Sequence, residues 1–231
     1  MTINFILGAC WASFFNLVIQ RHLRNESILL PPASHCDNCH HRLAWYDLIP
    51  IVSFLILHGR CRYCHAQINT LILQTELLLG VGFALIIPNI TSNYQILILI
   101  LFAYLAIWDC HTQTIPSWPL GVWLGLCLWI LPWQLNYLKL LPIYLLVTSL
   151  NHLSSFIGSG DIDILFLIWL TSGPPLFTIW VLFLACVLSL VYLLLVPRLY
   201  FNHRIAFVPF LFCGYALTTN FTAQLLTFTI P

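Results

Sequence analysis

Residues 175–196 read PLFTIWVLFLACVLSLVYLLLV, without one charged side chain. A helix of this length is about 33 Å long, and about 20 apolar residues are enough to cross the hydrocarbon core of a bilayer. The stretch therefore predicts a transmembrane helix, and it raises the question of whether the rest of the chain also lies in lipid.

The composition extends this interpretation to the whole chain. Of 231 residues, 61% are hydrophobic and 6% are charged, with a mean hydropathy of +0.94, whereas soluble domains carry about 25% charged residues. Apolar runs lie at 2–20, 70–88, 94–108, 117–133, 138–156, 162–173, 175–196 and 206–227. The sequence thus predicts an all-α membrane protein with about eight transmembrane helices and the lipid bilayer as a partner. A net charge of +1 gives nucleic acid no basic footprint, which argues against such a partner.

The basic residues predict the orientation of the spans. Seven of the eight Lys and Arg residues fall in the loops after spans one and seven: Arg21, Arg24, Arg42, Arg60, Arg62, Arg198 and Arg204. Only Lys139 falls on the opposite side. The positive-inside rule therefore places both loops in the cytoplasm and both termini outside. The first run has no basic segment before it, so we expect a retained span and not a cleaved signal peptide.

Four of the nine cysteines form two CxxC pairs in the loop after the first span, Cys36-Asp-Asn-Cys39 and Cys61-Arg-Tyr-Cys64. The 21 residues between the pairs lie just beyond the usual zinc spacing. Four thiolates close a tetrahedral shell and leave no open ligand position, which indicates a structural zinc ion. The loop is too small to build its own hydrophobic core, so we expect a bound metal ion to stabilise its fold.

Other interpretations of this loop stay open. The four thiols could be unconnected, or a zinc ion with an open ligand position could be catalytic, while a cytoplasmic loop disfavours disulfides. Neighbouring histidines could replace a cysteine as ligand, and these are His35, His40, His41 and His65. The apolar run 48–57 is too short to span, and we expect it to pack on the bilayer surface.

Four acidic residues lie in or beside the predicted spans, namely Glu76, Asp109, Asp161 and Asp163. Ionisable groups at membrane depth are costly, which makes each a functional candidate. Asp109 ends the third span and Asp161 opens the sixth, so both are expected at the cytoplasmic membrane edge. One ionised carboxylate can take a proton from water while a protonated partner polarises a scissile carbonyl. We therefore predict that Asp109 and Asp161 form an aspartyl dyad.

The motif Gly158-Ser-Gly-Asp161 surrounds the second acid. Two glycines let a backbone approach closely, so Gly158 and Gly160 are expected to bind substrate. The alternative is an ordinary helix-start turn capped by Asp161. On a helix Asp163 points away from Asp161, and helix-start electrostatics explain its presence. Glu76 is either a supporting functional residue or a charge paired with a loop arginine or histidine.

Taken together, these motifs resemble the bacterial type IV prepilin peptidases, which are membrane aspartyl proteases with a GxGD motif. The resembling segments are Ala12-Ser-Phe-Phe-Asn-Leu-Val-Ile-Gln-Arg21, the two CxxC pairs, Trp45-Tyr-Asp-Leu-Ile-Pro-Ile-Val-Ser53, Gln74-Thr-Glu-Leu-Leu-Leu-Gly80, Trp108-Asp-x-x-Thr-x-x-Ile-Pro116, Gly158-Ser-Gly-Asp161 and Ile205-Ala-Phe-Val-Pro-Phe. Their order and spacing, more than any single motif, make the resemblance specific.

The resemblance implies an enzyme that cleaves basic leader peptides from pilin or pseudopilin precursors at the cytoplasmic face of the plasma membrane. Asp109 and Asp161 would be its catalytic pair and the four loop cysteines its metal ligands. Many members also methylate the new N-terminus with S-adenosylmethionine, and here that activity rests on the resemblance alone. We expect an N-terminal domain at 1–92, with the zinc loop, and a peptidase domain at 93–231.

The chain departs from the family pattern at Ser117, where an acidic residue is usual, and at Asp163, where a lysine is common. Its short form is similar to members that serve competence pseudopili. Two other function classes stay open: a proton-coupled membrane transporter and a non-catalytic zinc-loop membrane scaffold. A transporter would show repeated halves or helices broken near the bilayer midplane, whereas the acids here gather at one face.

Overall fold

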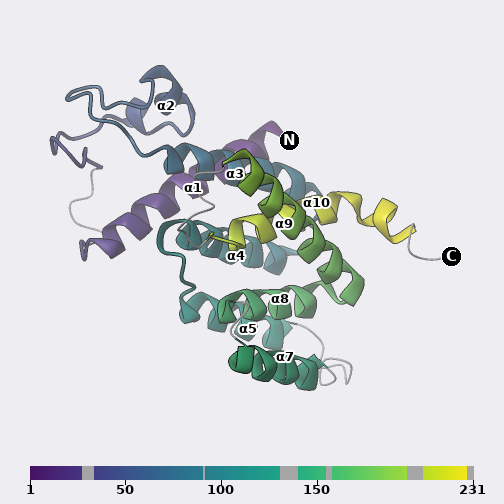
Figure 1. Cartoon of the computed structure of the whole chain (residues 1–231). Helices are drawn as coiled ribbons and strands as arrows, with labels where there is room; N and C mark the ends of the chain where they lie inside the picture. Colours follow the sequence, from purple (N-terminus) through teal and green to yellow (C-terminus); the bar gives the residue numbers. More distant parts are fainter. Residues whose placement is uncertain (28–33, 91, 131–139, 155–157, 197–204, 228–231) are drawn as a thin grey trace. The chain divides into compact units, whose positions relative to one another are not determined.

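The computed structural model describes residues 1–27, 34–90, 92–130, 140–154, 158–196 and 205–227 (Figure 1). Every predicted span corresponds to a helix, and in chain order these are α1 (Thr2–Leu23), α3 (Thr70–Ile86), α4 (Asn93–Thr112), α5 (Ser117–Ile130), α7 (Leu140–Ser154), α8 (Ser159–Ser172), α9 (Pro175–Leu195) and α10 (Val208–Thr227). The loop after α1 holds the short helices η1 (Trp45–Leu48) and α2 (Val52–Ile56), and η2 (Ile87–Asn89) extends α3. The predicted all-α membrane fold is confirmed.

Four helical segments are long and apolar enough to cross a membrane, namely α1, α3 with η2, α4 and α9. Helices α5 and α7 are shorter apolar helices in the described part of the chain. Helix α8 begins three residues before its predicted start, because Gly158 occupies the N-cap position and Ser159 already has helical geometry. Asp161 therefore lies inside the first turn of α8.

The chain forms two compact units, Met1–Pro88 and Asn89–Pro231. In the first unit α1 packs along α3. At their crossing a Cβ on Gly8 would lie 2.3 Å from the carbonyl oxygen of Leu79, so the glycine allows a close approach of the two backbones, as small residues do between membrane helices. Nearby, the buried Asn16 amide donates to the Thr75 hydroxyl over 2.8 Å, which fixes the register of the pair.

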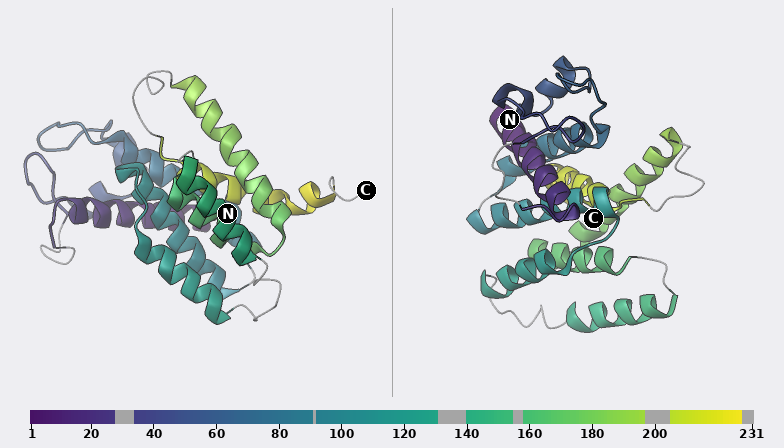
Figure 2. Two further views of the ribbon diagram at one scale, coloured as in Figure 1. Left: turned by 60° about the horizontal axis from the view of Figure 1, so that its bottom comes forward. Right: turned by 90° about the vertical axis from the view of Figure 1, so that its left-hand side faces the viewer.

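In the second unit an aromatic centre joins α4, α5 and α10. Phe102 of α4 is 1% exposed, and its ring lies 5.5 Å from that of Trp123, 5.3 Å from that of Phe212 and 5.8 Å from that of Tyr215. Helix α5 packs against both α4 and α8, and α7 packs on α8 (Figure 2). As a result α5 connects the two helices that carry the predicted catalytic acids.

Candidate active site and metal centre

The four loop cysteines gather at one point. The sulfur atoms of Cys36, Cys39, Cys61 and Cys64 all lie within 4.8 Å of one another, and those of Cys36 and Cys64 are 3.8 Å apart. A tetrahedral zinc site with Zn–S bonds of about 2.3 Å separates its sulfurs by about 3.8 Å. The donor set therefore has the chemistry and the size of a structural metal site.

Two similar hairpins bring the cysteines together. The backbone N–H of Cys36 donates to His41 and that of His40 donates to Cys36, and in the second hairpin Cys61 and His65 make the corresponding bonds with Ala66 and Cys61. His40 and His65 both adopt left-handed backbone, with φ of 54° and 57°. Each thus serves as the turn residue after its CxxC pair, and the metal cluster found among the described residues contains cysteines alone.

Two hydrogen-bond donors of the loop surround the Cys64 sulfur. The backbone N–H of Ala66 and the amide N–H of Asn38, 3.7 Å from the sulfur, both donate to it and lower the pKa of this thiol to about 6. The thiolate, and not the thiol, is the metal ligand. Hydrogen bonds from the loop therefore favour the thiolate at Cys64. At Cys39 a backbone hydrogen bond from His41 lowers the pKa, but burial and the two neighbouring cysteine sulfurs outweigh it and raise the pKa of Cys39 to about 11.

Glu76 joins this loop to the helix pair. Its side chain is buried at 4% exposure in α3, and its Oε2 atom accepts the backbone N–H of Ile51 over 2.7 Å. Ser13 of α1 provides a second hydrogen bond. The carboxylate is thus held by the backbone at Ile51 and a hydroxyl, and a charged loop partner is not seen within the described residues.

Asp109 lies in the last turn of α4 and is 5% exposed. Its Oδ2 atom accepts the backbone N–H of Val208, the first residue of α10, over 3.0 Å, and the N–H of Phe207 is a further donor. The positive end of a helix dipole stabilises a carboxylate placed there. Asp109 is therefore oriented by a helix 99 residues away in the chain.

Asp161 is half-buried, and its carboxylate folds back over its own turn. A Cβ on Gly158 would lie 2.8 Å from the Asp161 Oδ2 atom, so a side chain at Gly158 would displace the carboxylate. Asp109 is near enough for its charge to act on the Asp161 carboxyl. Asp161 of α8 therefore lies within the electrostatic reach of Asp109 of α4.

Ile115 connects the segment after Asp109 to the segment before Asp161. A Cβ on Gly160 would lie 2.5 Å from Cδ1 and 2.8 Å from Cβ of Ile115. The space that the sequence assigned to substrate beside Gly160 is therefore filled by Ile115. Helix α4 ends at this point. Its C-cap residue, Gln113, has a left-handed backbone conformation and donates its N–H to the Asp109 carbonyl over 2.9 Å.

Asp163 faces away from the pair, toward α7. The hydroxyl of Tyr144 donates to its Oδ1 atom over 2.7 Å. The Asp163 carboxylate therefore links α8 to α7 through this hydrogen bond.

Sequence reasoning did not identify three participants, Ile115, Tyr144 and the backbone at Val208. Ile115 stands in a motif that resembles the family, but its side chain has no chemistry that marks it. Val208 also stands in a segment that resembles the family, but its role is played by a backbone N–H that no side chain marks. Tyr144 carries no sequence signal, because its role comes from a tertiary contact.

The comparisons with known proteins agree with these features. Residues 6–90 match the bacterial peptidase A24 N-terminal domain family. The chain is 40% identical to a prepilin leader peptidase/N-methyltransferase of Myxococcus xanthus, over 40% of this chain and 27% of that protein. It is 37% identical to one of Klebsiella pneumoniae, over 53% of this chain and 58% of that protein. It is 29% identical to one of Dichelobacter nodosus, over 85% of this chain and 74% of that protein.

The chain thus covers less than two thirds of the length of the first two of these relatives and more than two thirds of the third. No solved structure matches.

Proposed function

We propose that this chain, whose residues 6–90 match the bacterial peptidase A24 N-terminal domain family, is a type IV prepilin peptidase, a membrane aspartic endopeptidase for prepilin-like proteins. The similarity to prepilin leader peptidase/N-methyltransferases supports this proposal. The enzyme would cleave the basic leader from pilin or pseudopilin precursors at the cytoplasmic face of the plasma membrane. The observation that supports this proposal best is that Asp161 of α8 lies within electrostatic reach of Asp109 of α4, although the two helices are separate in the chain. The relatives' names favour neither a transporter nor a non-catalytic scaffold.

In the proposed mechanism the two acids share the work of hydrolysis. One carboxylate takes a proton from the attacking water, and the other, protonated, polarises the scissile carbonyl and gives its proton to the oxygen. Collapse of the tetrahedral intermediate then returns that proton and delivers one to the leaving amine. Because the carboxylates interact, their two apparent pKa values belong to the pair.

The surroundings support this assignment of roles. The N–H groups of Val208 and Phe207 both donate to the Asp109 carboxylate and would orient it toward water or the partner acid. The turn at Gly158 keeps Asp161 close to the backbone before α8. We propose that Gly158 leaves room for the substrate chain, and that Gly160 serves the substrate through the position of its whole turn.

The metal loop and the topology complete the proposal. We propose that Cys36, Cys39, Cys61 and Cys64 bind one structural zinc ion, which would fix the fold of the loop without touching the substrate. The loop would be cytoplasmic and both termini outside, with residues 1–92 and 93–231 as N-terminal and peptidase domains. Glu76 would support the site by anchoring the loop.

Methylation is a second proposed activity, favoured by the names of the relatives. S-adenosylmethionine would supply the methyl group to the newly formed N-terminal amine. The names of the relatives, and no pattern among the described residues, carry this part of the proposal.

The test is to incubate the purified protein with a panel of prepilin-like substrates and to analyse the products by mass spectrometry. Cleavage after the leader supports the peptidase, and one added methyl group that requires S-adenosylmethionine supports the second activity. Intact substrate in every reaction would contradict the proposed function.

A further inference from the structure

An apolar surface lies on the loop beside the metal centre. Trp45 is 76% exposed and Ile56 is 65% exposed. The exposed large hydrophobic side chains of η1, α2 and the turn between them are Trp45, Tyr46, Leu48, Ile49, Val52, Leu55 and Ile56. Exposed large hydrophobic side chains gathered in one short segment are typical of an interaction site. We call these seven residues the apolar loop surface.

A hydrogen bond joins this surface to a candidate membrane span. Ile51, between η1 and α2, donates its N–H to Glu76 of α3. Helix α3 with η2 forms a 20-residue candidate span beginning at Thr70. Glu76 is six residues into it, or about 9 Å along the axis. This bond therefore attaches the segment between η1 and α2 to the first third of the candidate span. In membrane proteins Trp and Tyr gather where the ends of spans meet the headgroups.

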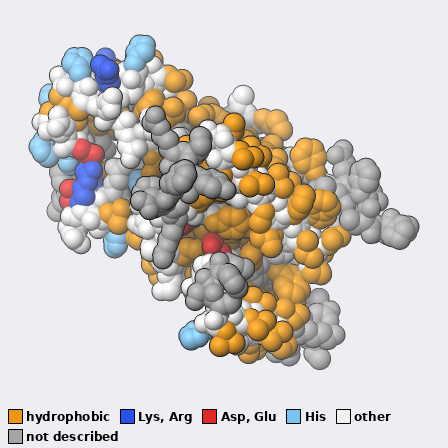
Figure 3. All heavy atoms as spheres, viewed as in Figure 1, with side chains coloured by type: hydrophobic (Ala, Val, Ile, Leu, Met, Phe, Trp, Pro, Cys, Tyr) orange, Lys and Arg blue, Asp and Glu red, His pale blue; other side chains and the backbone are white. Residues whose placement is uncertain are grey.

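Basic side chains adjoin the apolar loop surface. An open pocket is lined by Ile56, His58, Arg60, Arg62 and His65, and basic and histidine side chains appear beside hydrophobic ones over α2 in Figure 3. Apolar side chains next to cations are typical of segments that lie in the interface of anionic membranes.

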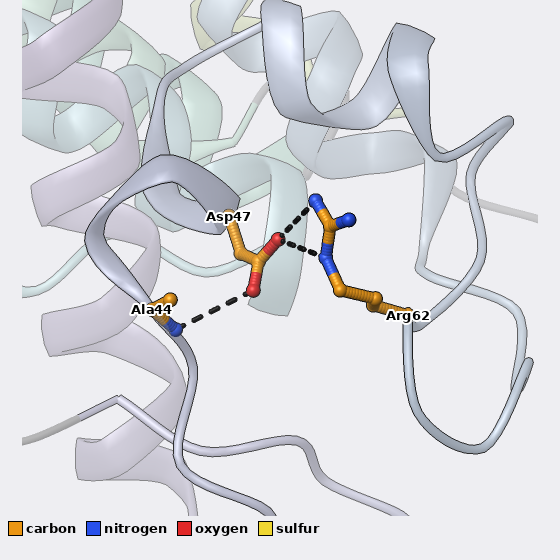
Figure 4. Close-up of polar contacts among 3 residues, drawn as sticks. All are labelled: Ala44, Asp47 and Arg62. Carbon is orange, nitrogen blue, oxygen red and sulfur yellow. Dashed lines mark hydrogen bonds and ion pairs between the residues drawn. The ribbon is translucent and has the colours of Figure 1, made fainter.

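The arginines of this pocket have different partners. Arg62 bonds the Asp47 carboxylate through Nε and Nη2, each over 2.9 Å, and so joins η1 to the second CxxC pair (Figure 4). Arg60 is exposed and forms no ion pair with another described residue. Its guanidinium is therefore the group available to bind an external anion.

We propose that the apolar loop surface inserts into the bilayer interface and that Arg60 binds the phosphate of an anionic phospholipid beside it. Helix α2 lies along the membrane plane, Glu76 sets its depth through Ile51, and Arg62 keeps the basic pocket attached to η1. The partner is the lipid surface; a protein substrate on the same surface is the competing outcome of the test.

The first experiment locates the surface. The photoreactive residue p-benzoylphenylalanine replaces Leu55 or Ile56 in the full chain, which is reconstituted in lipid nanodiscs and irradiated with and without a prepilin-like substrate. Val187, exposed on the span α9, is the lipid-facing reference. Phospholipid adducts at Leu55 and Ile56 in yields like that of Val187 are expected. Adducts confined to the substrate or to peptides of the same chain, or no lipid adduct, would overturn the proposal.

The second experiment identifies the headgroup. In discs with equal amounts of neutral and anionic lipid, adducts at Ile56 are expected to be enriched in the anionic lipid. One arginine near a charged leaflet changes such an equilibrium by about fivefold, so Arg60→Gln should reduce the enrichment by about that factor.

The matched control is Arg24→Gln, which removes the same charge from an arginine paired with Asp37 over 2.6 Å. This variant should keep the enrichment. Adducts that follow the lipid mixture in the unaltered protein, or equal losses in the two variants, would contradict a headgroup site at Arg60. Neither readout depends on cleavage, so the result is separate from that of the peptidase proposal.

Discussion

At the residue scale, the missing side chains of Gly158 and Gly160 set the packing around Asp161. Ile115 fills the place where a side chain at Gly160 would stand, and Asp161 lies where a side chain at Gly158 would stand. The glycines therefore set the position of Asp161 relative to the segment that follows Asp109. A methyl group added at either glycine has to move one of the two segments.

Gly160→Ala tests this packing. Its Cβ would come within 2.8 Å of the Ile115 Cβ, which cannot rotate away, so we expect cleavage to fall by about 10²-fold through misplacement of an acid. The measurements are the cleavage rate and the temperature of unfolding.

The control for Gly160→Ala is Gly125→Ala in α5, where an added Cβ meets no atom within 4 Å. There alanine should leave the rate unchanged and stabilise the helix by up to about 1 kcal/mol. Equal activity of both variants would show that the contact with Ile115 does not position the site.

Tyr144→Phe tests the bond between α7 and α8. Removal of the hydroxyl leaves the Asp163 carboxylate without its 2.7 Å donor, and a lost hydrogen bond costs about 1 kcal/mol. Thermal unfolding in detergent should shift to lower temperature, while cleavage should be largely retained because Asp163 faces away from the pair. An unchanged unfolding temperature would contradict a structural role for this bond.

At the scale of elements, two hairpins and two short helices make a loop that has little core of its own. Of its four cysteines, Cys61 alone is buried, and Glu76 and Arg62 provide the polar connections described above. Metal binding and folding are coupled in units of this size. The loop should therefore depend on its metal far more than the membrane helices do.

Metal analysis tests this dependence. Purified protein should contain one zinc ion per chain, and the double variant Cys36→Ser with Cys61→Ser should contain none. Proteolysis within the loop should accelerate in that variant and after chelation, while the membrane helices stay protected. The control is Cys186→Ser, an exposed cysteine of α9 outside the cluster. Undiminished zinc in the double variant would contradict the site.

At the scale of the whole molecule, the sequence predicted the helices and the cysteine cluster, because both depend on patterns of neighbouring residues. Apolar length located a helix at every predicted run, and four of these helical segments are long and apolar enough to cross a membrane among the described residues. The CxxC spacing identified four sulfurs that the structure brings together. The hydrogen bond from the Val208 N–H to Asp109 could not be predicted from the sequence, because it joins residues 99 positions apart and its donor is a backbone atom. The proximity of Ile115 to Gly160 was likewise not predictable, because it joins two segments that are distant in the chain.

Asp109 and Asp161 both belong to the second unit, and their joint action is the central claim. Asn keeps a carbonyl oxygen that can accept the Val208 N–H, so Asp109→Asn should fold and insert. The same is expected of Asp161→Asn. An amide cannot exchange protons as an acid or a base, so each variant should lose about 10²-fold or more in rate.

The direct measurement is cleavage of a prepilin-like substrate in membranes by Asp109→Asn, Asp161→Asn and, as the control, Asp163→Asn, with membrane insertion and zinc content verified for each. We predict that the first two variants do not cleave and that the third retains much of its activity. Full cleavage by either of the first two would contradict an aspartyl dyad at Asp109 and Asp161.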